Sequence, residues 1–182
     1  MKQPKIVTSK SIYSDSYLKI IHDRLTYSSN EWNQIFFDKV YKNSVVVIPV
    51  ESNGVYLIRQ YRHPIRKFLW QFPAGTFEKN VSSLKLAHKE LREETGMVAR
   101  EMKKIGTLYS EPGLSTDKTD VYVAQQVKKL YKRNLDLSEI GMNMSFFKFG
   151  EIDIMIKEGK ITCGITLSAY LLFLFYTKRL TS

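Results

Sequence analysis

Alternating polar and apolar side chains near the start of the chain predict two neighbouring β-strands. The alternation runs in part through residues 17–26 and again through residues 32–40. Between them, residues 27–31 read Tyr-Ser-Ser-Asn-Glu, which is the composition of a turn. Together these segments predict an antiparallel hairpin.

A group of strands is expected after the hairpin. Residues 44–50 form a β-branched run that predicts a buried strand. Ser52, Asn53 and Gly54 then give the signal of a tight turn. Further strands are predicted at residues 55–60, 103–110, 119–126 and 143–149.

The clearest helix signal lies between Ser82 and Gly96. Ser82 or Ser83 can cap the free backbone N–H groups at the start, and Gly96 stands where a left-handed cap needs glycine. Residues 151–158 also have helical spacing, and the apolar residues 165–176 predict a buried or interface helix. This mixture of short strands and helices predicts an α+β fold with α/β/α layers.

Three carboxylates crowd the end of the first predicted helix. Glu90 is three residues before Glu93 and four before Glu94, so the side chains are neighbours on one helix face. They repel one another, and the helix macrodipole disfavours negative charge at this end. Oxygen ligands of this kind are what Mg²⁺ or Mn²⁺ takes, so the acids are candidate metal ligands. An acidic helix end is also typical of a solvated face.

Residues 75–97 resemble the Nudix box, whose pattern is GX5EX7REUXEEXGU with U a bulky apolar residue. The matching positions are Gly75, Glu90, Leu91, Glu93, Glu94, Gly96 and Met97. Val81 stands where the family has its first glutamate, and Lys89 stands where it has arginine. The resemblance implies a Nudix fold with a mixed β-sheet, a catalytic loop and helix, and an N-terminal antiparallel hairpin.

Two further regions are similar to the ADP-ribose and nucleoside-diphosphate-sugar pyrophosphatases of that family. Residues 59–62 and 70–75 resemble the QYR and E-x-PAG motifs of this branch, with Gln71 in place of the glutamate, and residues 110–115 resemble its PG(F/L)S loop. The resemblance implies hydrolysis of ADP-ribose or a related nucleotide sugar to a nucleoside monophosphate and a sugar phosphate, with Mg²⁺ or Mn²⁺ as cofactor. The alternatives are a pyrophosphatase for GDP-mannose or another nucleotide sugar, and a Nudix domain that binds a nucleotide without cleaving it.

The same resemblance suggests which groups hold the metal. Glu90 and Glu94 are the first expected ligands, and Glu93 is the third, as a ligand or as an orienting group that acts through water. The backbone carbonyl of Ala74 is a further ligand of the family, presented by the turn before Gly75.

The general base is expected on a loop at residues 134–141. The ADP-ribose branch carries its catalytic glutamate on a mobile loop before the last strand. This chain offers two acids there, Asp136 and Glu139, and Glu139 is the closer positional match. If neither acts, Glu93 is the expected catalytic acid of the box.

The substrate contacts are expected from several separate segments. Arg62 is the candidate diphosphate clamp, because guanidinium gives two parallel donors that match phosphate oxygens; the alternative is a surface arginine lying over an apolar strand. Trp32 is the candidate for stacking on the nucleobase, with ordinary hairpin packing as the alternative, and Tyr17 is a second aromatic face. Pro112 and Gly113 belong to the loop that indicates the ADP-ribose branch and are expected beside the substrate.

Composition narrows the possible partners and location. The net charge of +10 suits an anionic substrate, and no long Lys/Arg run of nucleic-acid type is present, so neither nucleic acid nor a membrane is expected as a partner. The single cysteine, Cys163, cannot form an intrachain disulfide, and no secretory signal is recognised. A cytoplasmic location is therefore expected.

The length suits one domain. We expect residues 1–182 to form a single Nudix hydrolase domain, with the hairpin in residues 1–42 and the Nudix core in residues 43–182. Enzymes of the ADP-ribose branch are usually homodimers that share their N-terminal hairpins, and the resemblance implies the same here.

Overall fold

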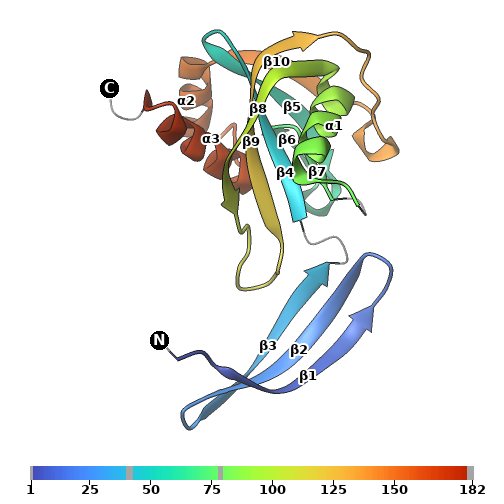
Figure 1. Cartoon of the computed structure of the whole chain (residues 1–182), viewed down its shortest axis with the longest axis vertical. Helices are drawn as coiled ribbons and strands as arrows, with labels where there is room; N and C mark the ends of the chain where they lie inside the picture. Colours follow the sequence, from blue (N-terminus) through green and yellow to red (C-terminus); the bar gives the residue numbers. More distant parts are fainter. Residues whose placement is uncertain (1, 40–42, 78–79, 180–182) are drawn as a thin grey trace.

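The N-terminal part of the chain forms a sheet of its own. The computed structural model describes residues 2–39, 43–77 and 80–179. Three antiparallel strands lie in the order β1-β2-β3 and form the lower part of Figure 1. They are β1 (Lys5–Ser14), β2 (Leu18–Tyr27) and β3 (Asn30–Lys39).

The predicted hairpin is confirmed as β2 and β3, but β1 was not predicted. The register between β1 and β2 shifts between Ile6 and Thr8 and again between Ser11 and Tyr13. Each shift interrupts the alternation of side chains, so the sequence of β1 shows no continuous period of two. All ten residues of β1 are exposed, which removes the hydrophobic signal as well.

The rest of the chain forms a seven-stranded mixed sheet. The order is β10-β5-β4-β9-β8, with β6 paired to β5 and β7 paired to β4. Strands β4 and β9 run parallel, and the other pairs are antiparallel. The strands are β4 (Asn43–Glu51), β5 (Gly54–Arg62), β6 (Lys67–Gln71), β7 (Ala74–Thr76), β8 (Met97–Leu108), β9 (Lys118–Lys129) and β10 (Asn143–Lys148).

Helices cover both faces of this sheet (Figure 1). One face carries α1 (Ser83–Thr95), and the other carries α2 (Phe149–Lys157) and α3 (Gly164–Tyr176). Two short 3-10 helices, η1 (His63–Ile65) and η2 (Leu137–Glu139), lie in the connections. The layers agree with the predicted α+β class.

None of the helices in the described residues has both the length and the apolar character needed to cross a membrane.

Strand β4 is the centre of the core. Val46 and Ile48 pack with the α2 and α3 side, and Val45 and Val47 pack with the α1 side. All four are at most 1% exposed, so the strand is buried on both faces and its sequence is almost continuously apolar. Full burial of such a side chain stabilises the fold by about 1.5–3 kcal/mol.

Helix α1 begins and ends as its sequence predicts. Ser82 is the N-cap, and its hydroxyl accepts the N–H of Lys85 at 3.4 Å. Gly96 takes a φ of 73°, and its N–H donates to the carbonyl of Arg92 at 2.8 Å. A Cβ at Gly96 would also lie 2.3 Å from the carbonyl oxygen of Tyr131, so glycine is required here for conformation and for space.

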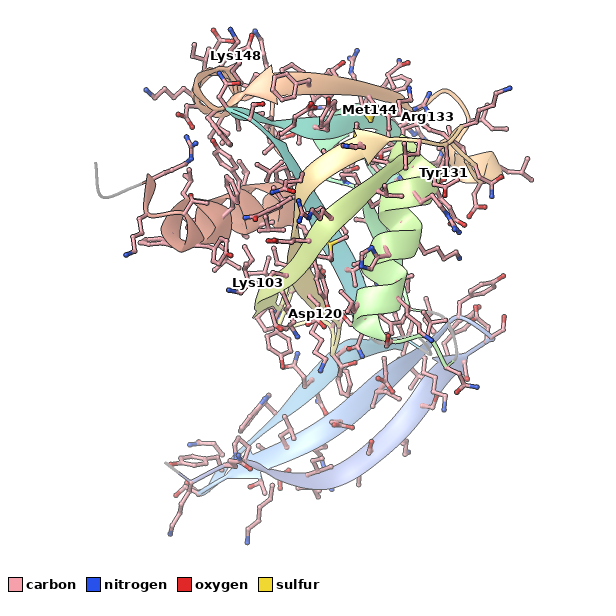
Figure 2. The ribbon with its side chains drawn as sticks, turned by 45° about the horizontal axis from the view of Figure 1, so that its top comes forward. Lys103, Asp120, Tyr131, Arg133, Met144 and Lys148 are labelled. Carbon is pink, nitrogen blue, oxygen red and sulfur yellow. The ribbon has the colours of Figure 1, made fainter. Side chains whose placement is uncertain are left out.

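The start of α1 is fixed to the sheet by a polar network. Asp120 on β9 accepts hydrogen bonds from Ser83 at 2.7 Å and from Thr107 at 2.8 Å, and it pairs with Lys104 at 2.7 Å. Burial alone would raise the pKa of Asp120, but the bonds from Lys104, Ser83 and Thr107 outweigh it and lower the pKa below its ordinary value. Figure 2 shows Asp120 near this end of the helix.

Among the described residues, the loop of residues 111–117 makes hydrogen bonds and an ion pair with the N-terminal sheet. The N–H of Phe37 donates to the carbonyl of Leu114 at 2.7 Å, and the side chain of Gln34 donates to the carbonyl of Gly113 at 2.8 Å. Lys39 forms an ion pair with Asp117.

The single-domain organisation of the chain stays a prediction. The boundary expected between residues 42 and 43 falls beside residues 40–42, which lie outside the described residues.

Candidate active site

The end of helix α1 places a carboxylate in the interior. Glu94 is 1% exposed, and its Oε2 accepts the backbone N–H of Ala74, at the start of β7, at 3.0 Å. Burial raises the pKa of Glu94 well above its ordinary value, and the charges of Glu90 and Glu139 raise it further. The N–H of Ala74 and the charge of Arg62 act in the opposite direction. A bound cation would stabilise the ionised form of a carboxylate that is buried in this way.

Gly75 leaves room for the second carboxylate. A Cβ at this position would lie 2.1 Å from the carboxyl carbon and 2.1 Å from Oε1 of Glu90. Only a residue without a side chain lets the β7 backbone approach Glu90 this closely. Glu90 and Glu94 thus meet the two consecutive residues Ala74 and Gly75, as the resemblance to the box implied.

The third carboxylate comes from the loop after β9. The N–H groups of Leu130 and Tyr131 both donate to the carbonyl of Gly96 at 3.0 Å, and Asn134 N–H donates to the carbonyl of Glu93 at 2.9 Å. Figure 2 shows Tyr131 beside the C-terminal end of α1. These bonds hold the loop against the helix, and the charge of Glu139 consequently acts on Glu94. The carboxylate of Glu139 also accepts the N–H of Asp136 at 2.9 Å.

Glu93 stands apart from this group. Its Oε2 lies 3.7 Å from Lys89 Nζ, one helical turn away, and it is not among the charges that shift the pKa of Glu94. The charges that raise the pKa of Glu94 are thus those of Glu90 and Glu139, and the expected role of Glu93, as a third ligand or as an orienting group through water, stays a prediction. In the described residues, no three His, Cys, Asp or Glu side chains are arranged closely enough to hold a metal ion by themselves.

The donor set still suits a hard divalent cation. The pKa of Glu94 is raised because its buried negative charge is incompletely compensated, and a cation would supply that compensation. Mg²⁺ takes oxygen ligands and usually binds through one or two carboxylates together with substrate phosphates. Two helix carboxylates and a backbone turn therefore fit such an ion better than a closed protein cage would.

Arg62 faces the same side of the sheet. It is the last residue of β5, is partly buried, and lowers the pKa of Glu94 through its charge. Its Nε donates to Oε1 of Gln71 at 2.7 Å. The position fits the predicted anion clamp, whereas a role as a solvent-facing surface arginine fits it less well.

The other predicted substrate contacts lie farther from the carboxylates. Pro112 and Gly113 line a pocket of about 210 Å³ together with side chains of β3, so they contact the N-terminal sheet. Tyr17 lies in the turn before β2 and is 74% exposed. Trp32 lies seven residues before Lys39 on β3, which is about 23 Å along an extended strand. Trp32 belongs to the N-terminal sheet, whereas Glu90 and Glu94 belong to α1 in the core.

A family model matches this arrangement of loop, helix and sheet. The model of the NUDIX domain matches residues 40–157, which is more than half of the chain. The chain belongs to the Nudix family. The predicted family is thereby confirmed.

Curated Nudix relatives of the chain include two ADP-ribose pyrophosphatases. That of Bacillus subtilis (strain 168) is 34% identical over 98 residues, which is 53% of this chain and 53% of the relative. That of Mycobacterium tuberculosis (strain ATCC 25618 / H37Rv) is 28% identical over 130 residues, which is 70% of this chain and 63% of the relative. The matches thus span about half to two thirds of the length of these relatives. Their names agree with the branch that the motifs resembled.

A solved structure shows the same Nudix fold. The crystal structure of an ADP compounds hydrolase matches with a TM-score of 0.83 over 98% of this chain and 96% of that chain, at 17% identity. The predicted α+β Nudix fold is confirmed by this likeness.

The two departures from the Nudix box have structural explanations. Val81 is partly buried and packs against the apolar cluster under α1, which includes Leu86 and Leu91. Lys89 is near Glu93, so the cation and the acid remain neighbours. Neither departure removes a carboxylate from the group around Glu94.

One set of contacts in the site was not predicted. The side chain of Gln71 bridges Arg62 and Cys163, with its Nε2 donating to Cys163 Sγ at 3.1 Å. The two residues are 92 positions apart, so no local pattern in the sequence could indicate that they meet.

Proposed function

We propose that this Nudix chain hydrolyses the diphosphate bond of ADP-ribose or a related nucleoside diphosphate sugar, with Mg²⁺ or Mn²⁺ as cofactor. The products would be a nucleoside monophosphate and a sugar phosphate. One observation carries the proposal: the buried Glu94 lies at the Ala74–Gly75 turn and shares its surroundings with the carboxylates of Glu90 and Glu139. The names of the two curated relatives support the substrate class.

The chemistry needs positive charge and a positioned base. A new P–O bond forms between phosphorus and water, the P–O–P bridge breaks, and negative charge builds on the leaving phosphate. A divalent cation at this site would neutralise the diphosphate, orient it and lower the pKa of a bound water. Glu90, Glu94 and the carbonyl of Ala74 would hold that cation. Arg62 would bind the diphosphate oxygens through parallel N–H donors.

Glu139 is the proposed general base. A positioned base typically contributes about 10²–10⁴-fold to the rate, because it accepts the proton of the attacking water in the transition state. In this structure the Glu139 carboxylate accepts the backbone N–H of Asp136. That bond uses only one of the two carboxylate oxygens, so the other oxygen could accept the proton of a water.

We further propose that the chain acts as a homodimer in the cytoplasm. The N-terminal sheet exposes large apolar side chains on β1, β2 and β3, and patches of this kind mark interaction surfaces. A second copy would cover them, and it could place Trp32 beside a nucleobase bound at the partner's core. Light scattering would test this: the proposal predicts the mass of two chains, and a mass of one chain would contradict it.

The direct test of the activity is incubation with ADP-ribose and Mg²⁺. Separation of the products should show AMP and ribose 5-phosphate, and no turnover should occur when the metal is chelated. A panel of nucleotide sugars that includes GDP-mannose would then rank the substrates. If no nucleotide sugar turns over with Mg²⁺ or Mn²⁺, the hydrolase proposal is wrong.

A second candidate function is binding of a nucleotide without cleavage. Two observations favour it: Glu93 lies beside Lys89, and one carboxylate oxygen of Glu139 accepts a hydrogen bond from its own loop. Tight binding of ADP-ribose without product formation over hours would support this alternative. The presence of Glu90 and Glu139 around the buried Glu94 favours hydrolysis, because a binder gains nothing from several acids beside a diphosphate.

A further inference from the structure

We propose that Gln71 is a positioning residue for Arg62, and that it selects which guanidinium nitrogens bind the diphosphate. The inference rests on the proposed function. Arg62 Nε donates to Gln71 Oε1 at 2.7 Å, and Gln71 Nε2 donates to Cys163 Sγ at 3.1 Å. Gln71 is only 9% exposed, so its amide is held between two partners away from bulk water.

The bond to Gln71 uses one particular donor of Arg62. A guanidinium has five N–H donors in a fixed plane, and Nε carries one of them. With Nε engaged, the two terminal nitrogens, Nη1 and Nη2, are the pair that can face a diphosphate. Within the described residues no carboxylate forms an ion pair with Arg62, so its positive charge is available to an anion.

The Nε–H of Arg62 fixes which way the amide of Gln71 points, because a guanidinium nitrogen can only donate. The carbonyl end of the amide therefore turns toward Arg62, and the amide N–H donates to the sulfur of Cys163. The reversed amide would set an N–H donor against the Nε–H donor of Arg62, which is repulsive. Cys163 is the N-cap residue of α3, so this contact also connects the start of that helix to β6.

The amide of Gln71 carries no charge, and this affects how Arg62 can bind an anion. A carboxylate at this position would also accept the Nε–H, but it would form an ion pair with the guanidinium and oppose the approach of an anionic substrate. The amide orients Arg62 and leaves its charge for the diphosphate. Gln71 therefore contributes to substrate affinity through Arg62 and makes no contact with the substrate itself.

Two variants separate orientation from charge. Gln71→Met keeps the length of the side chain and removes both hydrogen bonds, and Gln71→Glu keeps an acceptor and adds a negative charge. The loss of one hydrogen bond corresponds to about 3–10-fold in affinity. We expect KM to rise about 3–10-fold in Gln71→Met and about tenfold or more in Gln71→Glu, with kcat changed less than about threefold. The dissociation constant of ADP-ribose, measured by calorimetry without divalent metal, should rise in parallel.

A matched control makes the comparison specific. Gln125→Glu adds the same charge on β9, outside these contacts, and should leave KM within about twofold of wild type. Melting temperatures measured alongside identify any variant whose fold is damaged. Unchanged KM and unchanged ADP-ribose affinity in both Gln71 variants would overturn the inference. A wild-type chain that neither binds nor hydrolyses any nucleotide sugar would instead contradict the proposed function.

Discussion

The two sheets of this chain differ in what holds them. In the core, β4 has five consecutive buried residues, Val45–Pro49, between helices on both faces. In the N-terminal sheet, β1 has no buried residue, and Ile6, Ile12 and Tyr17 are each more than half exposed. The core is stabilised by burial within the chain, whereas the N-terminal sheet presents surface that its own chain does not cover.

This difference suggests that the two sheets have different roles in the proposed reaction. The carboxylates that act on one another, Glu90, Glu94 and Glu139, all belong to the core, together with Arg62. The aromatic candidate for base recognition, Trp32, belongs to the N-terminal sheet. We therefore expect changes in the core to affect turnover or stability, and changes in the N-terminal sheet to affect substrate affinity and assembly.

The largest effect is expected from Glu94→Gln. The amide can still accept the N–H of Ala74, but it cannot supply negative charge to a divalent cation. We predict a fall in kcat/KM of about a thousandfold, which corresponds to about 4 kcal/mol of transition-state stabilisation. Steady-state kinetics with ADP-ribose and Mg²⁺ would measure it, and the mass in solution should stay unchanged. A rate close to that of wild type would remove Glu94 from the metal site.

A somewhat smaller effect is expected from Glu139→Gln. Loss of the proposed base should lower kcat by about a hundredfold with little change in KM, because the group acts in the transition state. Asp136→Asn, in the same loop, is the control and should keep kcat within about threefold. If the two variants behave alike, the base lies elsewhere.

Substituting each of the two tryptophans would compare the two regions directly. Trp70 packs against Phe147 at 5.0 Å between ring centroids in the core, so Trp70→Ala should lower the free energy of unfolding by about 3 kcal/mol. Trp32→Ala should leave stability almost unchanged and raise KM about tenfold, since stacking on a base contributes about 1–3 kcal/mol. Urea unfolding and steady-state kinetics on both variants would measure this. An unchanged KM in Trp32→Ala would assign Trp32 to hairpin packing.

The smallest effect concerns the pH dependence of stability without divalent metal. The pKa of Glu94 is raised in the folded state, so the folded chain binds its proton more tightly than the unfolded chain does. This stabilisation is present at low pH and is lost as the pH rises from about the ordinary value of 4.5 through the folded pKa. Glu94→Gln should thus have a melting temperature a few degrees above wild type at pH 8, and the gap should shrink toward pH 5. A gap that grows on acidification would contradict the assignment.

The parts predicted from sequence are those with local signals. Helix α1 with its Ser82 cap and Gly96 end, the buried strand β4, and the two strands of the hairpin all followed from patterns within a few residues. The box placed Glu90 and Glu94 beside Ala74 and Gly75, because its spacing encodes a loop followed by a helix.

The remaining features depend on long-range contacts. Strand β1 was missed because its bulges and its exposure remove the periodic signal, and β6 and β7 are too short to show one. The influence of Glu139 on Glu94 depends on a loop about 45 residues away folding against the helix, so the box alone could not show it, and the role of Glu93 stays a prediction. The bridge from Arg62 through Gln71 to Cys163 joins three separate segments, so only the folded chain reveals it.

The most direct test is the position of a metal ion in the crystal. Crystals soaked with Mn²⁺ and ADP-ribose should show anomalous scattering between the carboxylates of Glu90 and Glu94, beside the turn at Ala74. The same soak of Glu94→Gln should show a much weaker peak. Anomalous signal confined to other parts of the chain, with both carboxylates directed into solvent, would contradict the account.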